Sequence, residues 1–142
     1  LKLVIAGRRN YDSEEIERQL SLELGDKVIY LGFVTDEEKL RLYQNCACHV
    51  YASKYEGFGI PPVESLVVGT PTVIADNSSL SELIPATEFG YLQGDVDDLC
   101  EKIEWQINKR CDHVANFDFE AYKRKYSWSR VAAEYLSLLE QV

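Results

Sequence analysis

The sequence predicts an α/β protein, a three-layer domain in which helices cover both faces of a mainly parallel sheet. Short apolar runs that end near glycine alternate along the chain with segments of helical periodicity, and this alternation is typical of right-handed strand-helix-strand units. The 142 residues, 46% of them apolar, are enough for one domain with a substantial core. No linker or repeat interrupts the pattern, so we expect a single domain over residues 1–142.

The first strand is predicted at residues 1–6, where LKLVIA is a nearly continuous apolar run. Such a run is typical of a strand that is buried on both faces. A helix is predicted over residues 13–24, because apolar residues recur there at helical spacing and Gly25 ends the pattern. A second strand, residues 27–31, stops at Gly32.

The next helix is predicted to begin at a capping box formed by Thr35 and Glu38. Its periodicity turns Leu40 and Tyr43 toward the core. A third strand, residues 47–52, follows that helix and leads into a segment rich in glycine and proline.

The remaining elements continue the alternation of strands and helices. Val63, Leu66 and Val67 form the apolar face of a helix after the proline pair. We predict helices at 62–68, 95–110, 116–126 and 127–140, strands at 72–75 and 89–92, and a capping box at 79–82 before a short helix.

The composition excludes several classes of function. A net charge of −9 argues against nucleic acid or an anionic membrane surface as a partner, because both require a basic patch. No apolar run approaches the roughly 20 residues that span a bilayer, and no signal peptide is recognisable. We therefore expect a soluble, cytoplasmic protein with no membrane-spanning segment and with reduced, mostly buried cysteines.

The start of the chain suggests a longer protein. The sequence contains no methionine, and residue 1 already lies inside a strand pattern. We therefore expect these residues to be a piece of a larger chain.

Residues 51–64, YASKYEGFGIPPVE, combine features of an anion-binding turn. In an open parallel sheet, ligands bind where a strand ends and a loop leads into a helix. Gly57 and Gly59 permit backbone angles that bring main-chain N–H groups toward one point. The helix after Pro61 adds free N–H groups and the positive end of its dipole. This turn is predicted to hold a phosphate with little help from basic side chains.

Two carboxylates flank the predicted phosphate site. Glu64 is placed in the first helical turn, within reach of a vicinal diol such as that of a ribose. Glu56 precedes the turn and would face the group that the phosphate carries. Each acid alone is also explained as a helix-start charge or as a solvated loop residue. The combination of strand, acid, glycines, proline, second acid and helix favours a ligand site.

At this level of detail the sequence resembles the C-terminal half of the retaining glycosyltransferases of the GT-B fold, the group 1 or glycogen-synthase-like family. The resemblance covers almost the whole chain, and Glu-Gly-Phe-Gly followed by Glu is its most specific motif. It implies a Rossmann-like domain that binds a nucleotide-diphosphate sugar, either a UDP-sugar or a GDP-sugar. The implied reaction transfers a hexosyl group to a hydroxyl acceptor, a glycan or a lipid-linked or small molecule.

The resemblance also implies roles for individual residues. Glu56 matches the acid that contacts the donor hexose and has been discussed as a nucleophile. Glu64 matches the acid that binds the ribose diol. The implied backbone contacts to the sugar and diphosphate come from Gly57, Phe58, Gly59 and Ile60, and those to the base come from Gly32, Phe33 and Val34, with Leu40 packed nearby.

The chain departs from the family pattern at one functional feature. Two basic residues that normally stabilise the leaving diphosphate follow an earlier strand, and Arg8 and Arg9 follow the wrong strand to replace them. That strand lies mid-sheet in the family; either it is outside this chain or the strands here pair differently. The acceptor-binding N-terminal domain is expected outside this chain. The resemblance implies no cofactor and no metal, and we expect the isolated residues to lack transferase activity.

Other interpretations compete with this one. Cys46, Cys48 and His49 invite a metal site, but strand alternation sends the histidine to the opposite face, so packing is favoured. Trp128 is expected to be a core or interdomain contact. A nucleotide-sugar epimerase, another GT-B enzyme such as a phosphorylase, and a non-catalytic nucleotide-binding module remain open as alternatives.

Overall fold

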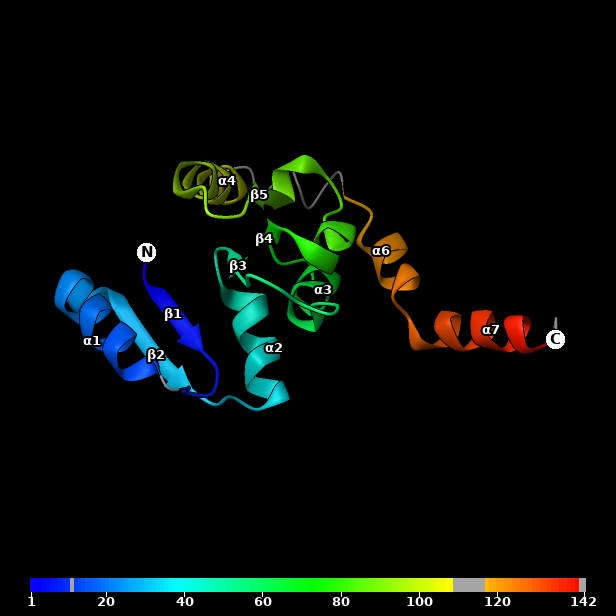
Figure 1. Ribbon diagram of the computed structural model, residues 1–142, viewed down its shortest axis with the longest axis horizontal. Helices are drawn as coiled ribbons and strands as arrows, with labels where there is room; N and C mark the ends of the chain where they lie inside the picture. The colour runs from blue at the N-terminus through cyan, green and yellow to red at the C-terminus, as the bar shows by residue number, and fades with distance from the viewer. Residues whose placement is uncertain (11, 109–116, 141–142) are drawn as a thin grey trace. The chain divides into compact units, whose positions relative to one another are not determined.

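The computed structural model describes residues 1–10, 12–108 and 117–140. These form two compact units, Leu1–Arg41 and Leu42–Val142, each of which is described by itself below (Figure 1). All strand pairs in the described residues are parallel, as the sequence predicts. The expectation of one domain over residues 1–142 stays a prediction.

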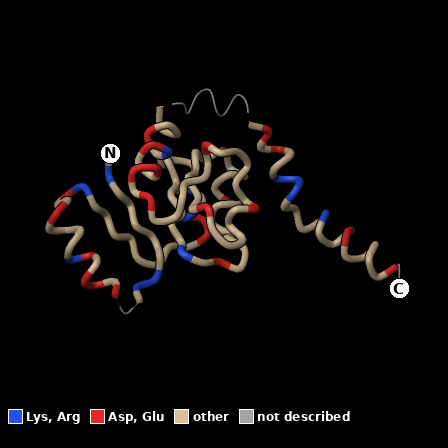
Figure 2. Tube along the Cα trace, turned by 45° about the horizontal axis from the view of Figure 1, so that its top comes forward, with Lys and Arg blue, Asp and Glu red and all other residues tan. Residues whose placement is uncertain are grey.

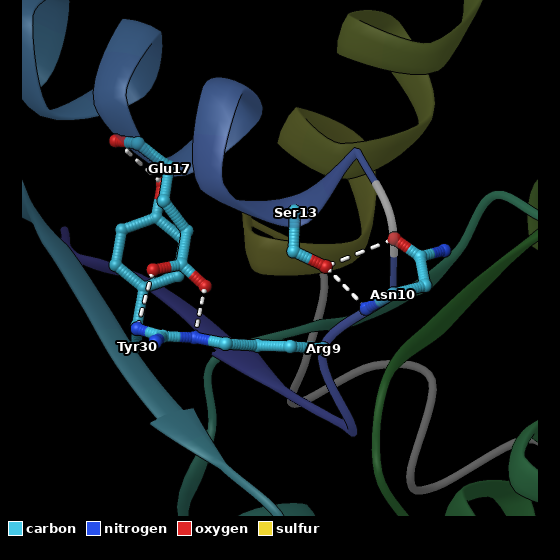
Figure 3. Close-up of polar contacts among 5 residues, drawn as sticks. All are labelled: Arg9, Asn10, Ser13, Glu17 and Tyr30. Atoms are coloured by element: carbon cyan, nitrogen blue, oxygen red, sulfur yellow. Dashed lines mark hydrogen bonds and ion pairs between the residues drawn. The ribbon is translucent and has the colours of Figure 1, made fainter.

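The first unit is a two-stranded sheet with one helix packed on it. Strand β1 pairs with β2 in parallel register, with Leu3 opposite Val28. The Tyr30 hydroxyl donates to the main-chain carbonyl oxygen of Glu17 at 3.4 Å, which ties the helix to the second strand (Figure 3). The elements are β1 (Leu3–Ala6), α1 (Ser13–Leu24), η1 (Gly25–Lys27), β2 (Val28–Gly32) and the first part of α2 (Asp36–Asn45).

The prediction that the first strand is buried on both faces is wrong for the described structure. Leu3 and Val4 are 46% and 42% exposed. Because successive side chains point to opposite faces, both faces of β1 are open in part. The physical reason is that α1 is the helix packed on this sheet within the first unit. In the described residues β1 is therefore an edge strand with an apolar surface.

The capping box at the start of α2 is confirmed. The main-chain N–H of Thr35 donates to Glu38 Oε2 at 2.8 Å, and the N–H of Glu38 donates back to Thr35 Oγ1 at 3.3 Å. These two bonds satisfy donors that have no partner inside a helix. Tyr43 is buried as predicted, at 8% exposed, whereas Leu40 is 40% exposed, so its predicted inward position is wrong. The apolar face of α2 is narrower than its sequence pattern suggests.

The second unit is built on a three-stranded parallel sheet in the order β3-β4-β5 (Figure 1). Helix α3 contacts β3 and β4, and α4 contacts β4 and β5. The elements are β3 (His49–Tyr51), α3 (Ile60–Val67), β4 (Thr72–Asp76), η2 (Ser78–Leu83), η3 (Thr87–Phe89), β5 (Gly90–Leu92), α4 (Val96–Asn108), α6 (Phe119–Lys125) and α7 (Trp128–Leu139).

Strand β4 is the centre of the core. Val73, Ile74 and Ala75 follow one another and are each 0% exposed. Since consecutive strand residues face opposite sides of a sheet, both faces of β4 are covered. Leu66 of α3, also 0% exposed, is part of the same cluster. The second unit therefore has the layered α/β arrangement that the sequence predicts.

Three further predictions for this unit need correction or fall outside the described residues. The capping box at 79–82 is wrong, because the Ser79 hydroxyl donates instead to the carbonyl oxygen of Glu56 at 2.7 Å. Trp128 is 87% exposed within the described residues and is not a core contact there. The predicted ends at 109–110 and 116, with Cys111 and His113, lie outside the described residues.

The start of α3 is set by a glycine that tolerates no side chain. Gly59 has φ +91°, and a Cβ there would lie 2.5 Å from Leu80 Cδ2 and 3.1 Å from Leu83 Cδ1. Gly57 lacks a positive φ, and a Cβ on it would meet nothing within 4 Å. The expectation that both glycines supply unusual backbone angles is therefore right for Gly59 and wrong for Gly57.

This contrast predicts different stabilities for two variants. Gly59→Ala should lower the free energy of unfolding by about 2–4 kcal/mol, because it adds both backbone strain and overpacking. Gly57→Ala is the matched control and should change it by less than about 1 kcal/mol. Urea unfolding followed by circular dichroism measures both values. Equal effects of the two substitutions would contradict the assignment of the constraint to Gly59.

Candidate functional site

The predicted site lies at the carboxyl end of β3, where the chain leaves the sheet and enters α3. Strand β3 ends at Tyr51 and α3 begins at Ile60, so the motif residues 56–60 span the intervening loop and the first residue of the helix. This is the position at which parallel α/β sheets bind ligands. The structure therefore places Glu56, the loop and Glu64 within one unit, around one strand-to-helix connection.

The main-chain N–H groups of this connection are not used in the hydrogen bonds of the described turns and loops. Within the described residues, the amides of Gly57, Phe58, Gly59 and Ile60 have no hydrogen-bond acceptor among the bonds of the turns, loops and side chains. Pro61 follows at the second helical position and carries no N–H. An anion is the natural partner for a set of open amides before a helix.

Glu64 lies deeper in α3 than the sequence suggests. Helix α3 begins at Ile60, so Glu64 is its fifth residue, and no acidic residue occupies the first turn. The predicted first-turn position is wrong because the helix starts before the two prolines. Glu64 is half-buried, and its carboxylate lies close enough to the Tyr43 hydroxyl to help burial raise the pKa of Tyr43. One carboxylate oxygen, Oε2, is buried and has no hydrogen-bond partner among the described residues.

Glu56 is held in the loop through both its side chain and its backbone. The Tyr51 hydroxyl donates to Glu56 Oε1 at 2.8 Å. The main-chain N–H of Glu56 donates to Ser78 Oγ at 3.3 Å, and its carbonyl accepts from Ser79 at 2.7 Å. The loop after β4 therefore fixes the backbone of Glu56, while the last residue of β3 orients its carboxylate.

The two large apolar residues of the motif remain accessible. Phe58 is 46% exposed and Ile60 is 60% exposed. The Phe58 ring packs edge-on against Tyr126, with 5.8 Å between ring centroids. Both side chains border the open amides without filling the core, which suits a surface that covers a ligand.

The predicted base-binding residues and Leu40 belong to the first unit: Gly32 ends β2, Phe33 and Val34 follow it, and Leu40 lies on α2. Gly32 has φ +67° and Val34 is half-buried, while Phe33 is 65% exposed and Leu40 is 40% exposed. The guanidinium of Arg8 lies 5.1 Å from the centroid of the Phe33 ring. The loops after β1 and β2 are joined by a bond from the N–H of Gly7 to the carbonyl oxygen of Gly32, at 2.8 Å.

The second arginine of the first unit has a structural partner. Arg9 donates to both carboxylate oxygens of Glu17, at 3.0 and 2.7 Å, as Figure 3 shows. Nearby, the N–H of Asn10 donates to Ser13 Oγ at 2.6 Å, which ties the preceding loop to the first residue of α1. Arg9 thus anchors its loop to α1, which agrees with the view that it does not replace a phosphate-binding cation.

A group of buried polar residues beside the motif was missed by sequence reasoning. His49 Nδ1 lies 2.9 Å from Ser65 Oγ, and Ser65 Oγ lies 2.9 Å from Thr72 Oγ1. The His49 ring packs against Tyr43 and Tyr51, with centroids 5.0 and 6.1 Å apart. The available signal was alternation along β3, which places His49 and Tyr51 on one face.

A separate hollow of about 450 Å³ lies at the carboxyl ends of β4 and β5. Its charged groups are engaged with neighbours in the protein. Asp76 accepts from Ser81 at 2.6 Å, and Asp98 accepts from the N–H of Leu92 at 2.7 Å and pairs with Lys102 at 3.8 Å. None of the residues that line it belongs to the motif. These contacts explain its polar lining as part of the fold.

The charge distribution agrees with a site that relies on main-chain groups. Asp and Glu number 24 against 15 Lys and Arg, and the acidic residues are spread over the helices (Figure 2). In residues 1–10, 12–108 and 117–140, no three His, Cys, Asp or Glu side chains are grouped to hold a metal ion. Cys46 and Cys48 are half-buried and Cys100 is exposed, so the expectation of mostly buried cysteines is wrong for the described residues. None of the helices in the same residues combines the length and apolar character required to cross a membrane.

Comparison with known proteins identifies the family. The sequence profile described as "Glycosyl transferases group 1" matches residues 1–124. This chain belongs to the group 1 glycosyl transferases. It is similar to the O-antigen chain mannosyltransferase RfbU of Salmonella typhimurium, with 32% identity over 134 residues that cover 86% of this chain and 36% of RfbU. The chain thus spans about a third of that relative.

Solved structures confirm the Rossmann-like α/β fold. The Anabaena protein Alr3699/HepE in complex with UDP matches with a TM-score of 0.86 and 21% identity, covering 100% of this chain and 41% of that one. The catalytic domain of cholesterol-alpha-glucosyltransferase from Helicobacter pylori matches with a TM-score of 0.68 and 25% identity, covering 86% of this chain and 76% of that one. The predicted fold class and family are therefore confirmed.

The buried histidine of this group 1 transferase domain predicts a pH dependence of stability. Burial lowers the pKa of His49 to about 4, whereas the unfolded chain binds that proton near pH 6.5. Stability from this group is fully present above pH 6.5 and is lost as pH falls toward 4, by at most about 1.4 kcal/mol per pH unit. His49→Asn keeps a polar group near Nδ1 and does not titrate in this range. Urea unfolding at several pH values should show a steeper loss in the natural protein, and equal slopes would contradict the prediction.

Proposed function

We propose that this chain is the donor-binding domain of a retaining hexosyltransferase that uses a nucleotide-diphosphate sugar. The observation that carries the proposal is the set of open main-chain amides at residues 57–60, flanked by two oriented carboxylates. Membership of the group 1 family supports glycosyl transfer as the reaction class. The chain supplies the donor half of that reaction.

The diphosphate would bind at the amides before α3. The left-handed Gly59 opens the helix, and the following N–H groups add the positive end of the helix dipole. Such preorganised dipoles stabilise charge that develops on a leaving diphosphate, so no metal or cofactor is required. The basic residues that would assist are assigned to a part of the protein outside this chain.

The two acids would bind the two ends of the donor. The half-buried Glu64 would accept hydrogen bonds from the ribose diol. Glu56 would contact the hexose hydroxyls at the reaction centre. The Phe33 ring and the main chain of Gly32 and Val34 would hold the base.

The nucleotide of the donor is proposed to be either UDP or GDP. A structural neighbour of 21% identity was solved with UDP, and a relative of 32% identity is named a mannosyltransferase. Because the chain spans 36% of that relative, we assign the glycan, lipid-linked or small-molecule acceptor to an N-terminal domain that this chain lacks. The isolated chain is accordingly proposed to bind donor without transferring sugar, and to act in the cytoplasm.

Titration with a panel of UDP- and GDP-sugars tests the donor assignment. Isothermal calorimetry on this chain should detect at least one of them. Absence of binding by every member would overturn the assignment. A complete transferase that contains this chain would then be assayed for its products, since transfer, epimerisation and phosphorolysis give different ones.

Substitution of the two acids should separate binding from catalysis. Glu64→Ala should weaken nucleotide binding about 10- to 100-fold, because it removes hydrogen bonds to a charged group. Glu56→Gln should leave nucleotide affinity within about twofold and lower kcat about 100-fold or more. Calorimetry gives the first value, and product formation by the complete transferase gives the second.

A matched control for these variants lies on α7. Glu134 pairs with Arg130 on an exposed surface, so Glu134→Gln should change neither quantity. Full activity of Glu56→Gln would contradict its assigned role, and unchanged affinity of Glu64→Ala would contradict the diol contact.

A further inference from the structure

Each of the two site acids lies beside a tyrosine hydroxyl. The Tyr51 hydroxyl donates to Glu56 Oε1 at 2.8 Å, and the Glu64 carboxylate is close enough to the Tyr43 hydroxyl to raise its pKa. Tyr51 is the last residue of β3 and Tyr43 lies on α2, so neither tyrosine belongs to the motif itself. The acids of the loop and of α3 are thus each oriented by a neighbouring element.

The two tyrosines are joined through His49. Its ring lies between theirs, with centroids 5.0 Å from Tyr43 and 6.1 Å from Tyr51. Ser65 Oγ lies 2.9 Å from His49 Nδ1 and also donates to the carbonyl oxygen of Pro62 at 3.0 Å, which ties the ring to α3. The contacts Glu56–Tyr51–His49–Tyr43–Glu64 therefore form one continuous series within the second unit.

The backbone around Glu56 is fixed independently of this series. Ser78 and Ser79 bond to the N–H and carbonyl of Glu56. Ser78 has φ +43°, a conformation that residues other than glycine rarely adopt. Asn77 Nδ2 donates to the carbonyl oxygen of Ser53 at 2.9 Å and holds the same two loops together. With the main chain fixed, the Tyr51 bond decides where the Glu56 carboxylate points.

Both tyrosines are suited to act as permanent donors. Burial raises the pKa of Tyr51, and the adjacent Glu56 carboxylate raises it further. Burial raises the pKa of Tyr43 in the same way, with Glu64 as the next cause. Both hydroxyls therefore keep their protons at neutral pH. The Glu56 carboxylate, which accepts the Tyr51 hydrogen bond on Oε1, can still accept a ligand hydroxyl on Oε2.

We propose that Tyr51 and Tyr43 are positioning residues of the donor site, Tyr51 for the hexose-facing Glu56 and Tyr43 for the diol-facing Glu64. This inference rests on the proposed function, because it assigns the two tyrosines through the two acids. The positioning role also predicts something that the proposed function does not. Loss of each tyrosine hydroxyl should reproduce, in weaker form, the effect of removing the carboxylate that this tyrosine positions. Both act through a carboxylate, and neither is assigned contact with the reacting atoms.

The test compares Tyr51→Phe and Tyr43→Phe in a complete transferase that contains this chain. Each substitution keeps the ring that packs on His49 and removes one hydroxyl. A hydrogen bond to a charged group corresponds to about a 10- to 100-fold effect. Tyr51→Phe should lower kcat by about 10-fold or more with the donor KM within about twofold. Tyr43→Phe should raise the donor KM and the nucleotide Kd by about 10-fold with kcat within about twofold.

Tyr122→Phe is the matched control for a structural role. Its buried hydroxyl donates to the carbonyl oxygen of Leu83 at 2.9 Å, away from both acids. This variant should lower Tm about as much as the other two while leaving kcat and KM unchanged. The proposal is overturned if Tyr51→Phe lowers Tm without lowering kcat, or if Tyr43→Phe lowers Tm without raising the donor KM.

Two reference measurements separate this proposal from the proposed function. If the natural protein transfers sugar and Glu56→Gln is inactive, full activity of Tyr51→Phe overturns the positioning role alone. If the natural protein binds no nucleotide-sugar, the proposed function fails and the positioning role fails with it.

Discussion

The left-handed backbone of Gly59 is the constraint on which the site depends. Leu80 and Leu83 crowd the place where a Cβ would lie at this residue, and its φ of +91° is a conformation that glycine adopts readily. This close approach brings the first turn of α3 against the segment that follows β4. The same segment supplies Ser79, which holds the carbonyl of Glu56. One small residue thus sets both the start of the helix and the position of the loop acid.

The polar groups beneath the loop are costly to bury and are therefore informative. A buried polar group is unfavourable unless it is hydrogen-bonded, and His49, Ser65 and Thr72 satisfy one another next to fully buried apolar residues of β4. Apolar side chains of similar size would pack at this place without such demands. The three polar residues hold one another's side chains in fixed orientations, because a hydrogen bond depends on the direction of its donor and acceptor and an apolar contact does not. That property fits the support of a site more closely than it fits simple packing.

Much of the fold and the location of the site could be predicted from the sequence, because both depend on local patterns. Apolar periodicity located α1 at its observed bounds, and the Thr35 and Glu38 spacing identified a capping box that exists. The exposure of Leu3 and the hydrogen bond from Tyr51 to Glu56 could not be predicted, since they depend on which elements pack together. The second capping-box match failed for the same reason: Ser79 bonds to a loop 23 positions away in sequence instead of to its own helix. The motif was recognisable because its strand, glycines, prolines and acids are contiguous, whereas its supporting residues are not.

The proposed function requires the amides of residues 57–60 to bind the diphosphate of a nucleotide-sugar. Titration of the ¹⁵N-labelled chain with UDP and with GDP, followed by two-dimensional NMR, tests it most directly. With the nucleotide that binds, the amide resonances that shift most within the second unit should be those of Gly57, Phe58, Gly59 and Ile60, and these four should saturate together. Saturable binding that leaves these four resonances in place, or no response to either nucleotide, would contradict a diphosphate site at these amides.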